Sequence, residues 1–259
     1  LGSLAFSLNF DPDDWYIIKR IGYISAITED SYSIHFASEN GIFSYDKNSS
    51  DFSFNEFLSY NIDDAPIFHF YYDPYSDYYW LIQQYKVSIR SSLSNYWRDI
   101  PLHYLGINST YDIVDIGSSP NYIWIKHDIF SNNDIMVAID PNTGMVIDNN
   151  KNIDNSERYL INWGNSVYGD SGNNFNISDY SIFSNWVNQS DTLMLRNKAS
   201  EDDWEERKIL SLRNRYGKKL KPTLKMEDEQ SNIWIGTNNS TILKGWKHSP
   251  RIELFNSGL

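Results

Sequence analysis

The residues best suited to bind a ligand lie in one short stretch, residues 69–80, where tyrosines alternate with carboxylates around a proline. Residues 73–77 have the composition of a tight turn, so we expect them at the edge of a sheet. An exposed tyrosine beside a carboxylate can stack on a sugar ring or anchor a protein partner. The alternative is ordinary strand packing that ends in an exposed turn. The binding residues predicted from this pattern are Tyr72, Tyr75, Asp77 and Tyr78.

The strands on either side of this turn decide where each tyrosine points. Successive side chains of a strand point to opposite faces of the sheet. We therefore expect Tyr71 and Tyr79 in one environment, with Tyr72 and Tyr78 in another.

Three other strings resemble catalytic, cofactor or metal motifs, and loops explain them better. Residues 169–172 match the surroundings of a trypsin-like serine, but no upstream histidine lies in a catalytic context. Residues 148–154 alternate oxygen ligands like a calcium loop, yet Ile153 replaces the required glycine and Tyr159 the closing carboxylate. Residues 138–144 resemble a quinoprotein hairpin and are interpreted as a turn. We predict no catalytic residue, no metal site and no cofactor.

Composition narrows the class of protein. The 259 residues carry 22 basic and 34 acidic side chains, with 19 Tyr, 13 Phe, 9 Trp and no Cys. A net charge of −12 argues against nucleic acid as a partner, because phosphate neutralisation needs a basic surface. No run approaches the roughly 18 apolar residues of a membrane span, so we expect no membrane insertion within this segment. The aromatic content indicates a large core.

Internal repeats point to the architecture. Short runs of apolar, β-branched and aromatic residues recur around His35, Trp80, Trp124 and Trp234, spaced 45, 44 and 110 residues apart. Each run lies between two further strand-like stretches joined by turn residues such as those at 40–41. Three or four short strands in a repeat of about 45 residues are typical of a propeller blade. A large ring on the second strand can wedge between adjacent sheets, so the three tryptophans should be buried.

The last of these runs carries a family resemblance. Residues 232–237, Asn-Ile-Trp-Ile-Gly-Thr, resemble the repeat of two-component-regulator-type β-propellers, whose blades have an apolar–Trp–apolar–Gly–Thr core. Residues 39–46 are similar to the hairpin that follows that core. The resemblance extends over residues 15–259, although Gly-Thr occurs only at Gly236-Thr237. It implies a bacterial sensing or surface module, periplasmic or extracellular, in which the propeller generally recognises a ligand without catalytic residues.

The expected fold is all-β, with one domain over residues 1–259. This domain forms a β-propeller of about five four-stranded blades. The propeller is either closed or left open as a fragment of a longer chain. The predicted repeats are residues 15–60, 61–105, 106–150, 151–215 and 216–259. The fourth is irregular. Trp163 and Tyr168 are expected in its strands, and residues 202–210 fit either a strand or a short helix.

The predicted function is a non-catalytic recognition, sensor or scaffold module of an extracytoplasmic bacterial protein, binding an unidentified ligand or protein partner in signal transduction. The alternative is a polysaccharide hydrolase or lyase with carboxylates from several blades around the central channel. Convergent carboxylates beside a histidine or an aromatic platform would favour the enzyme, whereas backbone and small residues would favour binding. A third possibility, assembly through blade edges, predicts a large exposed apolar patch.

Overall fold

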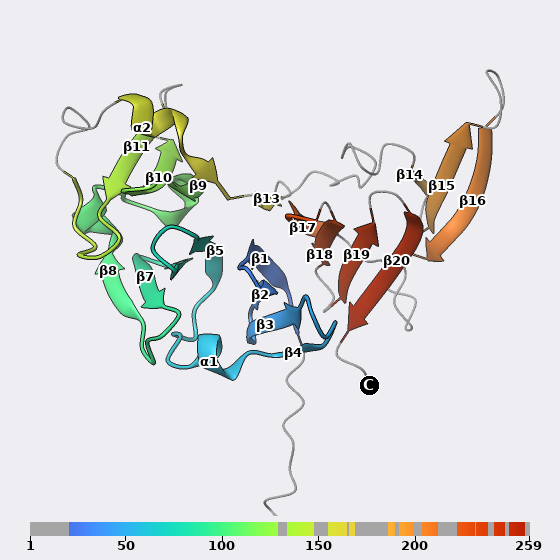
Figure 1. The fold of residues 1–259 in the computed structure, drawn as a ribbon, viewed down its shortest axis with the longest axis horizontal. Coiled ribbons are helices and arrows are strands. Elements are labelled where there is room, and N and C mark those ends of the chain that lie inside the picture. Colours follow the sequence, from blue (N-terminus) through green and yellow to red (C-terminus); the bar gives the residue numbers. More distant parts are fainter. Residues whose placement is uncertain are drawn as a thin grey trace, which may run out of the picture.

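The computed structural model describes residues 21–128, 134–147, 155–164, 166–168, 186–189, 192–198, 204–211, 222–230, 232–237, 241–246 and 249–256. These residues form antiparallel sheets with a few short helices (Figure 1). None of the helices in this part of the chain has the length and apolar character needed to cross a membrane.

The strands fall into five sheets. The first blade comprises β1 (Ile24–Glu29), β2 (Ser33–Ser38), β3 (Gly41–Asp46) and β4 (Phe52–Phe54). The second blade comprises β5 (Ile67–Asp73), β6 (Tyr78–Gln83), β7 (Lys86–Ser91) and β8 (Arg98–Pro101). The third blade comprises β9 (Ile113–Ser118), β10 (Ile123–Asp128), β11 (Asp134–Ile139) and β12 (Asn162–Trp163). The last blade comprises β13 (Ser166–Tyr168), β17 (Pro222–Glu227), β18 (Asn232–Thr237), β19 (Thr241–Trp246) and β20 (Ser249–Asn256).

The remaining elements are smaller. A three-stranded sheet comprises β14 (Trp186–Gln189), β15 (Thr192–Lys198) and β16 (Trp204–Ser211). Two short α-helices and two 3-10 helices lie between strands: α1 (Glu56–Ser59), α2 (Asn155–Tyr159), η2 (Leu102–Leu105) and η3 (Thr110–Asp112). The predicted hairpin turn at residues 40–41 is confirmed between β2 and β3, where Gly41 adopts a φ of 111° that favours glycine.

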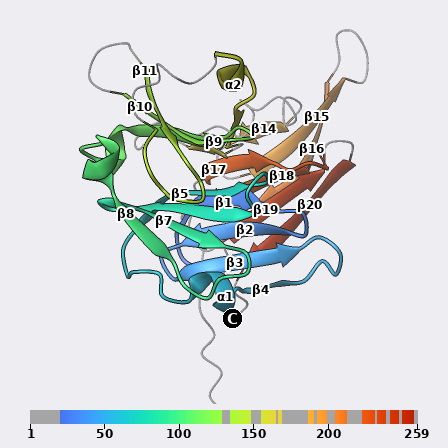
Figure 2. The ribbon, with the colours of Figure 1, turned by 60° about the vertical axis from the view of Figure 1, so that its left-hand side comes forward.

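Four of the sheets are arranged as propeller blades. Their inner strands are neighbours, because β1 contacts both β5 and β17, and β5 contacts β9. The order around the channel is therefore third, second, first and last blade (Figures 1 and 2). The prediction of an all-β propeller is confirmed, but a fifth blade is not: the fourth repeat supplies the three-stranded sheet, whose β16 lies beside β20.

Two short strands of the fourth repeat do not build the blade predicted for them. β12, with Trp163, pairs with the inner strand β9 of the third blade, and β13 pairs with the inner strand β17 of the last. Gly117 permits the first contact, because a Cβ there would lie 2.7 Å from the carbonyl oxygen of Asn162. The helix considered at residues 202–210 is wrong as well: β16 pairs with β15 as a strand.

The repeated tryptophans are buried as predicted. Trp80, Trp124 and Trp234 are each 0% exposed. The ring of Trp234 meets Phe36 and Tyr45 of the first blade at centroid distances of 5.5 and 4.8 Å. Trp80 lies in a cluster that joins the second and third blades. Two of these rings thus pack between adjacent blades, where they bury apolar area and exclude water.

The ring N–H groups of these tryptophans differ in their acceptors. In the last blade, Trp234 Nε1 donates to Asp228 Oδ2 at 2.8 Å, in the turn between the first two strands. In the third blade, Trp124 Nε1 donates to Ser119 Oγ at 2.9 Å in the equivalent turn. Trp80 Nε1 has no acceptor among the described residues. The same tryptophan position is therefore hydrogen-bonded to a carboxylate in one blade, to a hydroxyl in another and to no acceptor in the third.

The first and last blades are joined directly. Lys244 Nζ of β19 donates to the Tyr45 hydroxyl of β3 at 3.0 Å and lies 4.5 Å from the centre of that ring. The backbone N–H of Glu229 donates to Glu29 Oε2 across the same boundary at 2.9 Å. Buried cation–π and charge-assisted contacts of this kind hold the two ends of the repeat array together.

Tryptophan-to-phenylalanine substitutions test this grading. W234F should lower the free energy of unfolding by about 1–2 kcal/mol more than W80F, because it removes the donor of a buried bond to a carboxylate, whereas W80F removes an N–H without an acceptor. W124F should fall between them. Each substitution loses a similar buried volume, so the comparison isolates the hydrogen bond. Urea denaturation measures the difference, and equal losses for W234F and W80F would contradict it.

Candidate functional site

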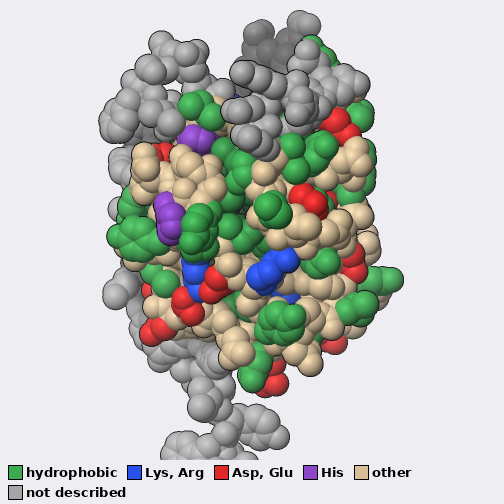
Figure 3. All heavy atoms as spheres, turned by 90° about the vertical axis from the view of Figure 1, so that its left-hand side faces the viewer, with side chains coloured by type: hydrophobic (Ala, Val, Ile, Leu, Met, Phe, Trp, Pro, Cys, Tyr) green, Lys and Arg blue, Asp and Glu red, His purple; other side chains and the backbone are tan. Residues whose placement is uncertain are grey.

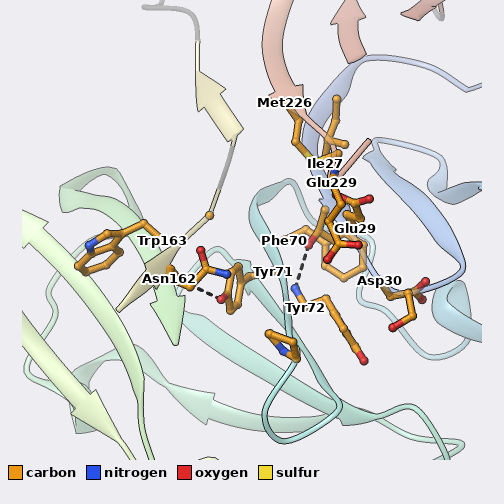
Figure 4. Close-up of a pocket in the computed structure, with 14 residues that line it drawn as sticks. Ile27, Glu29, Asp30, Phe70, Tyr71, Tyr72, Asn162, Trp163, Met226 and Glu229 are labelled. Carbon is orange, nitrogen blue, oxygen red and sulfur yellow. Dashed lines mark hydrogen bonds between the residues drawn. The ribbon is translucent and has the colours of Figure 1, made fainter. Parts of the chain in front are cut away.

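A cavity of about 140 Å³ lies at one end of the channel, where inner strands of the first, second and last blades meet β12 (Figure 4). It opens beside the turn that follows β1. Its lining combines hydrogen-bond acceptors with aromatic rings: Glu29, Asp30, Glu229, Phe70, Tyr71, Tyr72, Asn162 and Trp163. A concave site with a few convergent polar groups among rings is the usual form of a small-molecule site.

The turn after β1 orients the first of these carboxylates. Asp30 Oδ1 accepts hydrogen bonds from the backbone N–H groups of Tyr32, at 2.8 Å, and Ser33, at 2.7 Å. This Asx-type turn fixes the side chain through its own local backbone. The second oxygen, Oδ2, is left to face the neighbouring strands.

That second oxygen anchors a buried network. His35 Nε2 lies 2.8 Å from Asp30 Oδ2, and the Tyr79 hydroxyl donates to the same oxygen at 2.5 Å. Burial alone would raise the pKa of Asp30, but the hydrogen bond and charge of His35, with the bond from Tyr79, hold it well below its usual range. Burial and the Asp30 carboxylate raise the pKa of Tyr79. Asp30 is therefore an ionised, pre-oriented acceptor.

The adjacent carboxylate has the opposite environment. Burial raises the pKa of Glu29, although the ion pair with Lys47 Nζ, 2.6 Å from Glu29 Oε1, opposes the shift. Glu29 Oε2 accepts the N–H of Glu229 from the last blade. Two neighbouring carboxylates at one cavity thus have pKa values displaced in opposite directions. The exposed Glu229 side chain completes an acidic rim.

The aromatic wall comes from β5. The backbone N–H of Tyr72 donates to Thr28 Oγ1 of β1 at 2.9 Å, which fixes β5 against the first blade. On the opposite side, the Tyr71 hydroxyl lies 2.7 Å from Ser118 Oγ and donates to the carbonyl of Asn162 at 3.0 Å (Figure 4). This pair of bonds brings β12 to the cavity.

The structure separates the four predicted binding residues. Tyr72 lines the cavity, and its hydroxyl donates to Asp77 Oδ1 at 2.8 Å, so these two lie together. Tyr75 is 52% exposed on the turn between β5 and β6, outside the cavity lining. Tyr78 lines a different cavity on the outer part of the blade. Their role in binding stays a prediction.

The predicted partition of the tyrosines is wrong. In the β5–β6 hairpin, Tyr72 pairs with Tyr79 and Tyr71 pairs with Trp80. Residues directly opposite each other in an antiparallel pair lie on the same face of the sheet. Tyr79 therefore shares its face with Tyr72, at a ring-centroid distance of 5.1 Å, and not with Tyr71. The length of the turn sets this register, which alternation alone does not reveal.

Several residues of the cavity were not predicted from the sequence. Glu29 and Asp30 are not among the predicted binding residues, although an acidic pair at the end of an inner strand is a signal that could have marked them. Asn162 and Trp163 carried no such signal, because their position depends on β12 pairing with a distant strand.

The motif-like strings have separate outcomes. The turn interpretation of residues 138–144 is confirmed: Asp140 Oδ1 accepts the N–H of Asn142 at 2.8 Å, and Gly144 has a φ of 71°. Residues 169–172 and 148–154 lie outside the described residues. Within the described part of the chain, no three His, Asp or Glu side chains are grouped to hold a metal ion.

The fold and the cavity define an all-β protein of propeller type with an acceptor-rich cavity at one end of its channel. No protein-family model matches the chain, and no curated protein matches its sequence. It matches the extracellular domain of the putative hybrid two component system BT4673 from B. thetaiotaomicron, at 10% identity and a TM-score of 0.34, covering 90% of this chain and 27% of that one. It also matches PorZ, a surface component of the type-IX secretion system of Porphyromonas gingivalis, at 11% identity and a TM-score of 0.33, covering 90% and 28%. The chain thus spans less than a third of the length of either structure.

The charge on Asp30 can be tested through pH. D30N keeps the shape of the side chain but not its charge, and should lower the free energy of unfolding by about 2 kcal/mol at pH 7. Because the unfolded chain takes up the proton near the ordinary value of 3.8, the contribution of Asp30 is present above that pH and is lost as the pH falls toward the lower folded pKa. The gap between wild type and D30N should therefore narrow below about pH 4.

The control is D51N, which removes an exposed carboxylate. Its unfolding free energy should stay close to that of the wild type across the same pH series. A gap between wild type and D30N that stays constant from pH 7 to pH 3 would contradict the prediction.

Proposed function

We propose that the chain is a non-catalytic recognition module that binds a hydroxyl-rich ligand, such as a sugar, in the cavity at the end of its channel. The observation that carries the proposal is the combination of lining groups. The exposed carboxylate of Glu229 is an acceptor for ligand O–H groups, and the Tyr72 ring offers an apolar surface. With about 140 Å³, the cavity accommodates roughly one ring of such a ligand.

The hydrogen-bonding state of the carboxylates supports binding over turnover. Asp30 is held by His35, Tyr79 and its own turn, and Glu29 is held by Lys47 and the backbone of Glu229. A general acid or nucleophile must reach the reacting bond, whereas these groups are fixed by the fold. Fixed acceptors suit recognition, because their orientation costs no entropy on binding.

A polysaccharide-cleaving enzyme is the second candidate. One observation favours it: Glu29 and Asp30 line one cavity and have pKa values displaced in opposite directions, as acid and base pairs in glycosidases do. Tyr72 in the cavity lining, and His35 bonded to Asp30 outside it, also favour this candidate. The two candidates differ in whether a bound glycan is recovered intact.

The cellular context forms part of the proposal. The resemblance of residues 232–237 to two-component-regulator propeller repeats supports an extracytoplasmic place in a bacterial sensor or surface protein. In that setting the cavity would report on a ligand outside the cytoplasm, and the signal would pass to other parts of a longer protein.

A matched pair of tyrosine variants tests the proposed site. Short xylo-, cello-, malto- and chito-oligosaccharides are titrated into the protein by isothermal calorimetry. For any glycan that binds, Y72A should weaken the affinity about 10-fold, because it removes the aromatic wall of the cavity. Y75A removes an equally large ring from the exposed turn and should leave the affinity unchanged. E229Q should weaken binding less than Y72A.

The same samples decide between the two candidate functions. Reducing ends are assayed after prolonged incubation, and the recognition module should return the glycan intact. Release of reducing ends that is abolished in E29Q would establish the enzyme instead. Loss of binding in Y75A but not in Y72A would move the site to the exposed turn, and failure of all four glycan classes to bind would contradict a sugar ligand.

A further inference from the structure

A second cavity, of about 150 Å³, lies between the second and third blades, away from the channel. Its walls come from β6, β7, β8 and the turn that follows β11. The residues that matter for its chemistry are Tyr78, Tyr96, Arg98, Ile89, Ser94 and Asn142. Tyr78, one of the predicted binding residues, therefore belongs to this cavity and not to the one at the channel.

The guanidinium of Arg98 is oriented before any ligand arrives. Its Nη1 donates to the carbonyl of Asn142 at 3.0 Å, and its Nη2 approaches the carbonyl of Pro141 at 3.5 Å, both in the third blade. Gly144, in the left-handed conformation, makes room for this approach, because a Cβ there would lie 3.3 Å from Arg98 Nη2. The guanidinium has five N–H donors, and these two bonds use two of them. The other donors are therefore available to a ligand.

The aromatic wall is also held in place. Ser94 Oγ accepts the N–H of Tyr96 and donates to its carbonyl, at 3.3 and 3.2 Å. The carbonyl of Ser94 accepts from Arg90 Nε at 2.9 Å, and Arg90 is only 1% exposed. A buried cation thus fixes the loop that carries Tyr96, whose own ring is 67% exposed and free to cover a ligand.

The charge of this cavity is opposite to that of the channel cavity. None of the described residues that line it carries a carboxylate, and Arg98 is its cation. Asp140 does not line the cavity: its Oδ1 accepts the N–H groups of Asn142 and Thr143. Burial alone would raise the pKa of Asp140, but these bonds together with the charge of Arg98 lower it. Figure 3 shows the side of the molecule formed by the second and third blades, where a few basic and several acidic side chains lie among apolar and uncharged ones. In a chain of net charge −12, Arg98 gives this cavity a basic group.

We propose that this inter-blade cavity binds a small aromatic carboxylate. The carboxylate would accept hydrogen bonds from Arg98, for which a planar guanidinium is the best-matched partner. The ring would lie between Tyr78 and Tyr96 and above Ile89, which is buried at the base of the second blade. A cavity of about 150 Å³ has the volume that one benzene-sized ring needs.

Three probes of equal size separate charge from shape. Benzoate, benzamide and cyclohexanecarboxylate are titrated into the protein, followed by nitrogen-15 NMR shifts and calorimetry. Benzoate should bind, benzamide should bind at least about 10-fold more weakly because it lacks the charge, and cyclohexanecarboxylate should be weaker than benzoate because it cannot stack. The shifted resonances should include those of Tyr78, Tyr96 and Asn142.

Variants assign the effect to the cavity. R98Q should weaken benzoate binding at least about 10-fold, and Y96A should weaken it by a smaller factor. R158Q, on α2, and Y104A, on η2, are matched controls that should leave the affinity unchanged. Urea denaturation checks that each variant is folded.

The outcomes are distinct. Equal binding of benzoate and benzamide, or benzoate binding that survives R98Q, would overturn the proposal, as would the absence of any benzoate binding. Because the channel cavity lies elsewhere, Y72A should not change benzoate affinity. A failure of benzoate to bind would therefore say nothing against the proposed glycan site. A failure of the glycans to bind would likewise say nothing against the inter-blade site.

Discussion

The structure depends on a wedge repeated on the second strand of each blade. A ring at this position is buried in every blade, and in the first, third and last blades its ring nitrogen meets the turn that joins the first two strands. Trp80 of the second blade has no such acceptor among the described residues. Trp234 with Asp228 and Trp124 with Ser119 show the arrangement most clearly. An acceptor in the turn offsets the cost of removing the ring's N–H from water, so in these three blades the wedge favours a turn residue with a side-chain oxygen. The packing of the core and the choice of residue in the turn thus depend on each other.

The channel cavity lies beside the one blade in which the ring on the second strand is not a tryptophan. In the first blade His35 takes the place of tryptophan, and its Nε2 meets Asp30 in the equivalent turn. A smaller ring leaves room for the Tyr79 hydroxyl from the next blade to reach the same carboxylate. Unlike Asp228 and Ser119, the turn acceptor of this blade also lines a cavity. The cavity proposed to bind a ligand therefore lies at the repeat that departs from the pattern.

The same logic explains how much the sequence could predict. The wedges recur at a fixed spacing and bury large rings, so the spacing of Trp80, Trp124 and Trp234 is enough to identify their blades. Features that depend on register or on pairing across the chain were not predictable. The turn of the β5–β6 hairpin places Tyr72 opposite Tyr79, and β12 reaches the inner edge of β9 through the missing side chain of Gly117. Local composition contains neither fact.

β12 also limits what the channel cavity can accept. Asn162 is held there by pairing with Ser118 and by the Tyr71 hydroxyl, so the cavity is closed on that side by backbone that cannot rotate away as a side chain can. A ligand longer than one ring would then leave the cavity on its open side, beside the turn that follows β1, where the Glu229 side chain is exposed. Tyr72 would contact the enclosed ring, whereas Tyr75 lies outside the cavity lining. Selectivity would therefore rest on the enclosed ring, and the parts of the ligand that follow it would contribute less.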